Sequence, residues 1–98
     1  MIKQFCVYEY ETYPILIITN TIFNDVEGLL VAPLKIMGTS NCISKLQIPV
    51  NFDNQNYYVD LLDLATVSKK KINQNIEVNL QSYREQIKSG IDLLIDGF

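Results

Sequence analysis

The alternation of hydrophobic and polar positions in the first half of the chain predicts β-strands. Residues 4–11 are rich in aromatic and β-branched side chains, and the apolar run 15–19 is typical of a strand buried on both faces. Residues 29–34 predict another strand, in which Pro33 indicates a sheet edge or a bulge because proline has no N–H for a ladder. The Gly, Ser and Asn in residues 37–44 favour a loop or a short turn.

The second half continues this pattern with a predicted hairpin and two shorter strands. Segments 47–52 and 57–61 flank the stretch 53–56, whose Asp and Asn side chains tolerate the left-handed turn conformation. Residues 65–67 and 69–72 are the shorter strand candidates. Many short strands at close spacing indicate a small antiparallel barrel.

The last element is the one convincing helix. Ser82 and Glu85 match a capping box, which predicts the helix start. Ile87, Ile91 and Ile95 then recur every four residues and predict one buried stripe.

Three further residues refine this helix. Leu94 joins the apolar stripe. Gly90 lies inside the helix at a cost of ~1 kcal/mol relative to alanine, which suggests close packing against another backbone. Gly97 is placed to end the helix as its left-handed cap.

Composition restricts the class of protein. The 98 residues fit a single domain spanning 1–98, and 48% apolar with 19% charged residues argue against disorder. A net charge of −3 and an isoelectric point near 4.7 argue against direct nucleic-acid binding. Because the N-terminus lacks a signal-peptide pattern and no apolar run approaches ~18 residues, we expect a soluble cytoplasmic protein.

Candidate catalytic chemistry is sparse. The absence of histidine removes imidazole bases and all His-containing metal sites, and Cys6 with Cys42 is too little for a metal site or a disulfide framework. Asp60 and Asp63 resemble an acid–base pair but fit the mouth of a strand equally well. The lysines of 69–71 are better explained as protection of a strand edge than as a nucleic-acid patch. We therefore predict no catalytic residues, metal or cofactor.

The chain ends with an unusual charge arrangement. Asp92 and Asp96 are four residues apart on one face of the last turn, where the helix dipole already disfavours anions. The terminal carboxylate of Phe98 adds a third negative charge. Either these charges are simply solvated, or they await a cationic partner such as an arginine.

Four stretches together resemble the CcdB family of toxins, the gyrase poisons of type II toxin–antitoxin modules. QFCVYEY at 4–10 resembles the family's first strand, and LLVAPL at 29–34 resembles its Val-Ile-Pro-Leu strand. LDLATV at 62–67 resembles its Asp-Met-Ala-Ser-Val segment, and IKSGIDLLIDGF at 87–98 resembles its closing helix. Their order and spacing hold along nearly the whole chain, with about four residues fewer near Tyr13.

The resemblance implies a mainly β fold with one C-terminal α-helix, an SH3-like antiparallel barrel with a small extra sheet. It also implies a homodimer, with Leu94, Ile95 and Phe98 at the dimer interface. The function implied is that of a non-enzymatic toxin, associated with plasmid maintenance.

The family's last three residues carry the poisoning activity, by entering the dimer of the gyrase A subunit and trapping it with cleaved DNA. Carried over, the gyrase-binding residues are Asp96, Gly97 and Phe98, with Asp92 behind them. The best-known members have tryptophan at the position of Asp96 and isoleucine at that of Phe98. Aspartate cannot stack on a gyrase arginine as tryptophan does, although it can pair with its guanidinium.

A cognate antitoxin resembling CcdA is the second implied partner. Its disordered tail folds as it binds, and would cover Ile22, Phe23, Asn24 and the helix face that carries Asp92. Two alternatives stay open. One is a ribonuclease like the MazF and Kid toxins, which need cationic active-site residues, whereas Arg84 is the only arginine here. The other is a retargeted or inert homologue that keeps only antitoxin binding.

Overall fold

The computed structural model describes residues 1–20, 22, 25–38 and 44–97. Its strands are β1 (Cys6–Tyr10), β2 (Tyr13–Ile17), β3 (Gly28–Ile36), β4 (Gln47–Phe52), β5 (Gln55–Asp60), β6 (Ala65–Ser68) and β7 (Ile72–Asn79). Three short 3-10 turns lie between the later elements: η2 (Leu61–Asp63), η3 (Lys69–Lys71) and η4 (Gln81–Tyr83). The last element is the helix α1 (Arg84–Asp96). The prediction of a mainly β fold with one C-terminal helix is confirmed.

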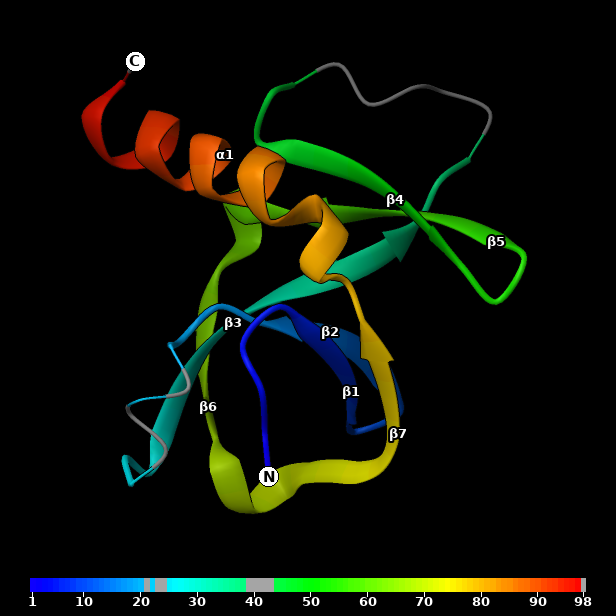
Figure 1. The fold of residues 1–98 in the computed structure, drawn as a ribbon, viewed down its shortest axis with the longest axis vertical. Helices are drawn as coiled ribbons and strands as arrows, with labels where there is room; N and C mark the ends of the chain where they lie inside the picture. The colour runs from blue at the N-terminus through cyan, green and yellow to red at the C-terminus, as the bar shows by residue number, and fades with distance from the viewer. Residues whose placement is uncertain (21, 23–24, 39–43, 98) are drawn as a thin grey trace.

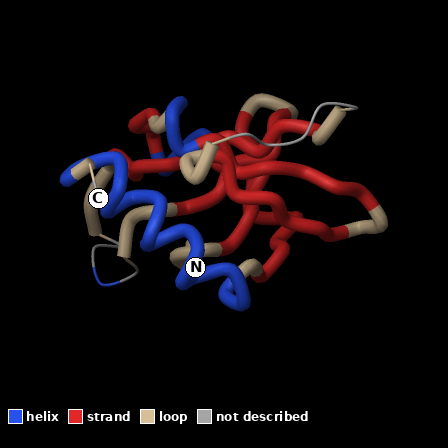
Figure 2. Tube along the Cα trace, turned by 90° about the horizontal axis from the view of Figure 1, so that it is seen from above, coloured by secondary structure: helices blue, strands red, loops and turns tan. Residues whose placement is uncertain are grey.

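All strand pairs are antiparallel, and the sheet curls because β3 changes partners along its length. The main order is β4-β5-β3-β2-β1-β7, with β6 pairing β3 off this path. On one side β3 pairs β2, while on the other it pairs β6 through Val31 and then β5 from Leu34. The resulting half-barrel is visible in Figure 1, where α1 lies beside β4 and the two termini lie at opposite ends. Figure 2 shows the helix along one side of the strands.

Pro33 lies at this change of partner and not at a sheet edge. It is paired with Ile15 of β2, and it falls between the β3 residues that pair β6 and those that pair β5. The prediction of an edge strand was therefore wrong. The missing N–H is tolerated at the junction of two ladders.

The core has two parts, one on each face of the central strands. Leu16 belongs to the cluster that α1 covers through Ile87, whereas its neighbours Ile15 and Ile17 belong to the cluster on the other face. Successive strand side chains point to opposite faces, so β2 is buried on both sides. The sequence prediction of such a strand is confirmed.

The tripeptide of lysines and the strand after it differ from the prediction. Residues Lys69–Lys71 form the turn η3, so they do not guard a strand edge. The strand begins at Ile72 instead and runs to Asn79, with mostly exposed residues and pairing only to β1. In a mostly exposed strand, hydrophobic and polar residues do not alternate clearly. The hydrophobic pattern therefore did not predict β7.

Both tight hairpins use two left-handed turn residues. The predicted turn contains Asp53 with φ 53° and Asn54 with φ 59°, two residue types that tolerate this conformation. The β1–β2 turn places Glu11 at φ 50° and Thr12 at φ 75°. A β-branched residue with positive φ is an outlier, so this second turn stores backbone strain.

The helix begins differently from the predicted capping box. Ser82 lies inside η4, and α1 starts at Arg84 with no side-chain hydrogen bond at its N-cap, Tyr83. The Asn79 side chain instead accepts a hydrogen bond from the backbone N–H of Gln81 (2.8 Å). This bond lies at the start of η4, so it precedes α1 and does not cap it.

The other helix predictions are largely confirmed. A Cβ at Gly90 would lie 2.5 Å from Leu61 Cδ1 and 3.2 Å from the backbone oxygen of Lys45, which is the expected close approach. Gly97 has φ 77°, and its N–H donates to the Leu93 carbonyl (2.8 Å) as a left-handed cap. In the described part of the chain, no helix is both long and apolar enough to cross a membrane.

Candidate functional site

The apolar stripe of α1 leaves the core before the helix ends. Ile87 is fully buried and Ile91 is half-buried, but Ile95 is 74% exposed and Leu94 is 38% exposed. The prediction that Ile95 completes a buried stripe was wrong for the isolated chain. Two large apolar side chains therefore face solvent at the tip of the helix, at the chain end marked C in Figure 1.

The acidic residues expected to bind gyrase lie on the same tip. Asp92 and Asp96 are exposed, and Gly97 follows directly as the cap. No basic residue lies in the last turn of α1, so the unfavourable interaction of Asp96 with the helix dipole is not offset there. The structure thus brings three of the four predicted residues together, while Phe98 lies outside the described residues.

The expected antitoxin surface is only partly described. Ile22 is 79% exposed, whereas Phe23 and Asn24 lie outside the described residues. Asn20, which precedes this segment, lines the same hollow as Asp92 of α1. The start of the loop and the helix face are therefore neighbours.

That hollow has a volume of about 270 Å³ and lies between α1 and the start of the chain. Arg84 and Lys88 line it, and the Arg84 guanidinium lies 5.5 Å from the centroid of the Phe5 ring, a cation–π distance. We call it the Arg84 hollow. Sequence reasoning missed this site. The one signal for it in the sequence is the i, i+4 spacing of Arg84 and Lys88, which places two cations on one face of a helix.

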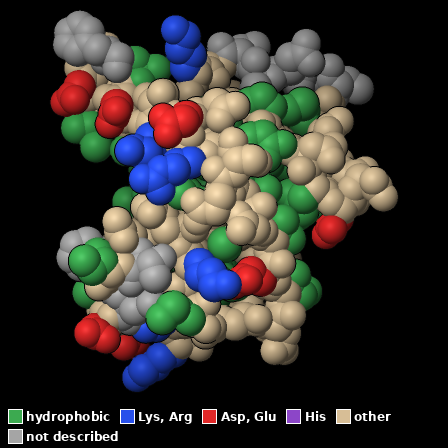
Figure 3. Space-filling model, viewed as in Figure 1, with side chains coloured by type: hydrophobic (Ala, Val, Ile, Leu, Met, Phe, Trp, Pro, Cys, Tyr) green, Lys and Arg blue, Asp and Glu red, His purple; other side chains and the backbone are tan. Residues whose placement is uncertain are grey.

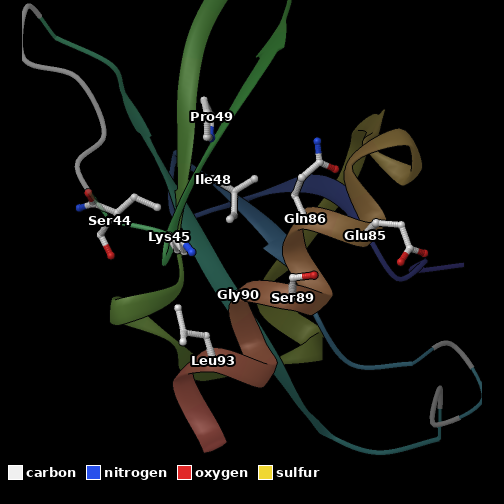
Figure 4. A pocket seen from close by; sticks show the side chains of 10 residues that line it. Ser44, Lys45, Ile48, Pro49, Glu85, Gln86, Ser89, Gly90 and Leu93 are labelled. Carbon is white, nitrogen blue, oxygen red and sulfur yellow. The ribbon is translucent and has the colours of Figure 1, made fainter. Parts of the chain in front are cut away.

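A larger hollow of about 640 Å³ lies on the other flank of α1, against β4. Figure 4 shows Ile48 of β4 on the side of the helix residues Ser89 and Gly90, with Pro49 further along the strand and Leu93 near one end. We call it the β4 groove. The signal in the sequence was Gly90, whose missing side chain allows the helix to approach the strand.

The edge of β4 beside this groove is closed to an added strand. The Gln47 N–H donates to the Ser44 carbonyl (3.1 Å), and the Asn51 N–H donates to the Tyr83 hydroxyl (3.2 Å). Pro49, between them, has no N–H. Without free donors, the groove does not suit recognition by strand addition.

The acidic pair considered for catalysis is held by a lysine. Lys35 Nζ lies 2.7 Å from Asp60 Oδ2 and 3.4 Å from Asp63 Oδ2, and the other Asp60 oxygen accepts from the Leu62 N–H (3.1 Å). The hydrogen bond to Asp60 raises the pKa of Lys35, so its amine stays protonated. This is the geometry of a structural ion pair that caps η2, and it offers no base or nucleophile.

A second polar cluster fixes the N-terminus. The buried Tyr8 hydroxyl donates to Glu77 (2.6 Å) and accepts from the Lys3 N–H (2.8 Å), and Lys3 Nζ lies 3.5 Å from Glu77. Burial, with the bond to Glu77 next, raises the pKa of Tyr8 far above its ordinary range. Cys6 beside them is a buried free thiol whose pKa is raised by burial. Among the described residues no cluster of acidic or cysteine side chains is suited to a metal ion.

Three solved structures with a similar fold are titled as toxins or as an endoribonuclease with its antitoxin. "Crystal structure of Mtb toxin" matches at 20% identity with a TM-score of 0.72, covering 87% of this chain and 94% of that one. "Mycobacterium tuberculosis toxin MazF-mt6" matches at 21% identity with a TM-score of 0.75, covering 92% and 95%. "Endoribonuclease in complex with its cognate antitoxin from Mycobacterial species" matches at 14% identity with a TM-score of 0.76, covering 98% and 96%.

At these identities the likeness to solved structures shows the fold. A comparison with curated protein sequences gives no match. The model of the CcdB protein family, however, matches residues 4–97, which is nearly the whole chain. The chain therefore belongs to the CcdB family, whose members are toxins of toxin–antitoxin modules.

Proposed function

We propose that this toxin binds the A subunit of DNA gyrase and traps the enzyme with its DNA cleaved, without catalysing a reaction itself. The binding residues are Asp92, Asp96, Gly97 and Phe98. The observation that carries the proposal is the exposed tip of α1, where apolar and acidic side chains project beyond the buried residues Ile87 and Gly90.

The tip has the chemistry for a cationic target. A carboxylate at Asp96 can form a charge-assisted, bidentate pair with an arginine of the partner. In the free protein the same carboxylate is unfavourable, because Asp92 lies one turn before it and the helix dipole opposes it. The presence of a destabilising charge at an exposed helix end supports a binding role.

We further propose a homodimer that uses Leu94, Ile95 and Phe98. Leu62 of η2, an element that contacts α1, is a further exposed apolar side chain at 58%. A two-fold symmetric toxin would match a two-fold symmetric target. Sedimentation equilibrium at micromolar concentration should give twice the chain mass of 11.3 kDa, and a species of that chain mass alone would contradict this.

The antitoxin is proposed to bind Ile22, Phe23, Asn24 and Asp92. Support comes from the exposure of Ile22 and from the shared hollow that joins Asn20 to Asp92. A bound antitoxin over this face would lie close to the gyrase-binding tip. Neutralisation would then follow from direct competition.

A DNA-cleavage assay with purified gyrase tests the proposal. We expect the toxin to accumulate linear DNA after denaturation of the trapped complex, and to inhibit supercoiling. A toxin that binds its antitoxin yet leaves gyrase unaffected would support the retargeted or inert homologue.

The similarity of fold to a MazF toxin keeps an endoribonuclease as the second candidate. That reading needs cationic catalytic groups, whereas Lys35 is engaged by Asp60 and Arg84 stacks near Phe5. We expect purified protein to leave single-stranded RNA intact. Specific cleavage that persists through repurification and disappears in an Arg84→Gln variant would favour the ribonuclease.

A further inference from the structure

The Arg84 hollow combines two cationic side chains with an apolar floor. Its walls come from the N-terminal segment, the residues after β2 and the first turns of α1, and its lining residues are Gln4, Phe5, Ile18, Asn20, Arg84, Lys88, Ile91 and Asp92. Figure 3 shows Lys and Arg side chains gathered over the helix beside acidic ones.

The two cations lack an acidic partner although carboxylates are in excess. The chain has 11 acidic and 8 basic residues. Nevertheless, neither Arg84 nor Lys88 forms an ion pair with any carboxylate in the part of the chain that the structure describes. Both are exposed and lie one helical turn apart, so they can converge on one anion.

The apolar floor is rigid. Phe5 is 2% exposed and has φ 59°, a strained conformation for this residue. Two backbone hydrogen bonds hold it, from its N–H to the Ile17 carbonyl (2.8 Å) and from the Leu80 N–H to its own carbonyl (2.9 Å). Its ring in turn supports the Arg84 guanidinium. A preorganised cation loses less freedom when it binds a ligand.

We infer that the Arg84 hollow binds the carboxylate of an acidic side chain in a partner peptide, with an apolar neighbour of that side chain against Ile18 and Ile91. The inference rests on the proposed antitoxin binding, because Asn20 and Asp92 place the hollow beside that surface. It adds the chemical class of the contact, an acidic residue next to an apolar one.

The surrounding charges favour a peptide over a nucleic acid. Asp92 lines one end of the hollow, and Asp96 lies one turn further along the exposed helix. A polynucleotide carries a negative charge at every phosphate, so its backbone would be repelled on leaving the hollow. A single carboxylate carries one charge beside the two cations, and it does not have to continue past Asp92 and Asp96.

A titration followed by nuclear magnetic resonance tests this with the full chain and three defined probes. They are the blocked tripeptides acetyl-Leu-Glu-Leu-amide and acetyl-Leu-Gln-Leu-amide, and hexauridylate. We expect the Glu peptide to shift the amide signals of Phe5, Arg84 and Lys88, and to bind about fivefold or more tightly than the Gln peptide, as a charge-assisted contact requires. Its advantage should shrink as salt is added.

Charge variants make the test specific. Arg84→Gln/Lys88→Gln should abolish the preference for the Glu peptide, whereas Lys45→Gln removes a cation from the β4 groove and should preserve it. Arg84→Glu/Lys88→Glu should instead prefer acetyl-Leu-Lys-Leu-amide. Thermal unfolding of each variant checks that it is folded.

Equal binding of the Glu and Gln peptides, or tighter binding of hexauridylate at the same amides, would overturn the inference. The proposed function is tested separately, by DNA cleavage with purified gyrase and by neutralisation with the antitoxin. If those succeed while the Glu peptide shows no preference, only the carboxylate contact fails. If those fail, the proposed function fails whatever the titration gives.

Discussion

The first turns of α1 and its last turn differ in what surrounds them. Ile87 is completely buried, and Gly90 lies so close to Leu61 that a methyl group has no room. One turn after Ile91 the same apolar stripe reaches Ile95, which is 74% exposed. Sequence periodicity treats the three isoleucines alike, but only the first is core.

This contrast divides one helix between stability and binding. The first turns fix the direction of the helix, because they are packed against β4 and η2. The last turn has few neighbours, so its side chains are available to a partner at little cost to the fold. We therefore expect substitutions in the first turns of α1 to lower the stability of the fold. Substitutions in its last turn should instead weaken gyrase trapping.

The largest effect should come from truncating the buried isoleucine. Ile87→Ala should lower the free energy of unfolding by about 3 kcal/mol, through lost transfer energy and the cavity left behind. Ile95→Ala, the matched change at the exposed end, should cost less than about 0.5 kcal/mol in the monomer. Urea unfolding compares the two variants at a protein concentration below the dissociation constant of the proposed dimer, where the chain is monomeric. Equal costs would contradict the division of the helix.

Gly90→Ala should come next. The added Cβ meets Leu61 Cδ1 at 2.5 Å and the Lys45 carbonyl oxygen at 3.2 Å, so the Leu61 side chain and the turn at Lys45 must shift. Overpacking of this kind costs about 1–3 kcal/mol, which exceeds the ~1 kcal/mol that alanine gains in helix propensity. Thermal unfolding should therefore show a net loss. Ser89→Ala, at the exposed neighbouring position, is the control and should change stability little.

Gly97→Ala should have a smaller effect. The left-handed φ of 77° is strained for alanine even though its Cβ would have open space. A loss of about 0.5–1 kcal/mol is expected, and Gly97→Asn should lose less because asparagine tolerates this conformation. A loss as large as that of Gly90→Ala would mean that the cap is part of the packed structure.

The smallest effect on the fold is expected at Asp96. Asp96→Asn removes a charge that opposes the helix dipole and Asp92, so it should stabilise the free toxin by about 0.5 kcal/mol at low salt. Gyrase binding should weaken by roughly 1–3 kcal/mol, the scale of a charge-assisted hydrogen bond. Asp96→Trp should trap gyrase at least as well as the parent. Unchanged inhibition by the Asn variant at low and moderate salt would make Asp96 a solvated bystander.

The sequence predicted the fold correctly where a strand is buried on both faces or where a hairpin has a tight turn. The strand at Ile15 and Ile17 was predictable because both faces are apolar, and the hairpin at Asp53 because its turn residues tolerate positive φ. The strand β7 was not, because most of its side chains are exposed and its pairing to β1 is set by the tertiary fold. The hydrogen bond from Gln81 to Asn79 was missed because it belongs to the 3-10 turn η4, which precedes α1 and contains Ser82.

The candidate site divides in a similar way. The motif-based residues Asp92, Asp96 and Gly97 lie together because they share one helix end. The Arg84 hollow was not predictable, since it joins the helix to Phe5, far away in the sequence. The pairing of Asp60 with Lys35 likewise depends on the β3–β5 ladder, in which Lys35 neighbours Tyr58.

We propose that the end of the chain binds gyrase while the rest of α1 holds the fold. A toxin truncated after Asp96, without Gly97 and Phe98, tests it directly in the gyrase DNA-cleavage assay, with circular dichroism and thermal unfolding on the same sample. We expect a folded protein, with stability within about 1–2 kcal/mol of the parent, that accumulates no cleaved DNA. A folded, truncated toxin that still traps gyrase as well as the full chain would show that Gly97 and Phe98 are not the gyrase-binding residues.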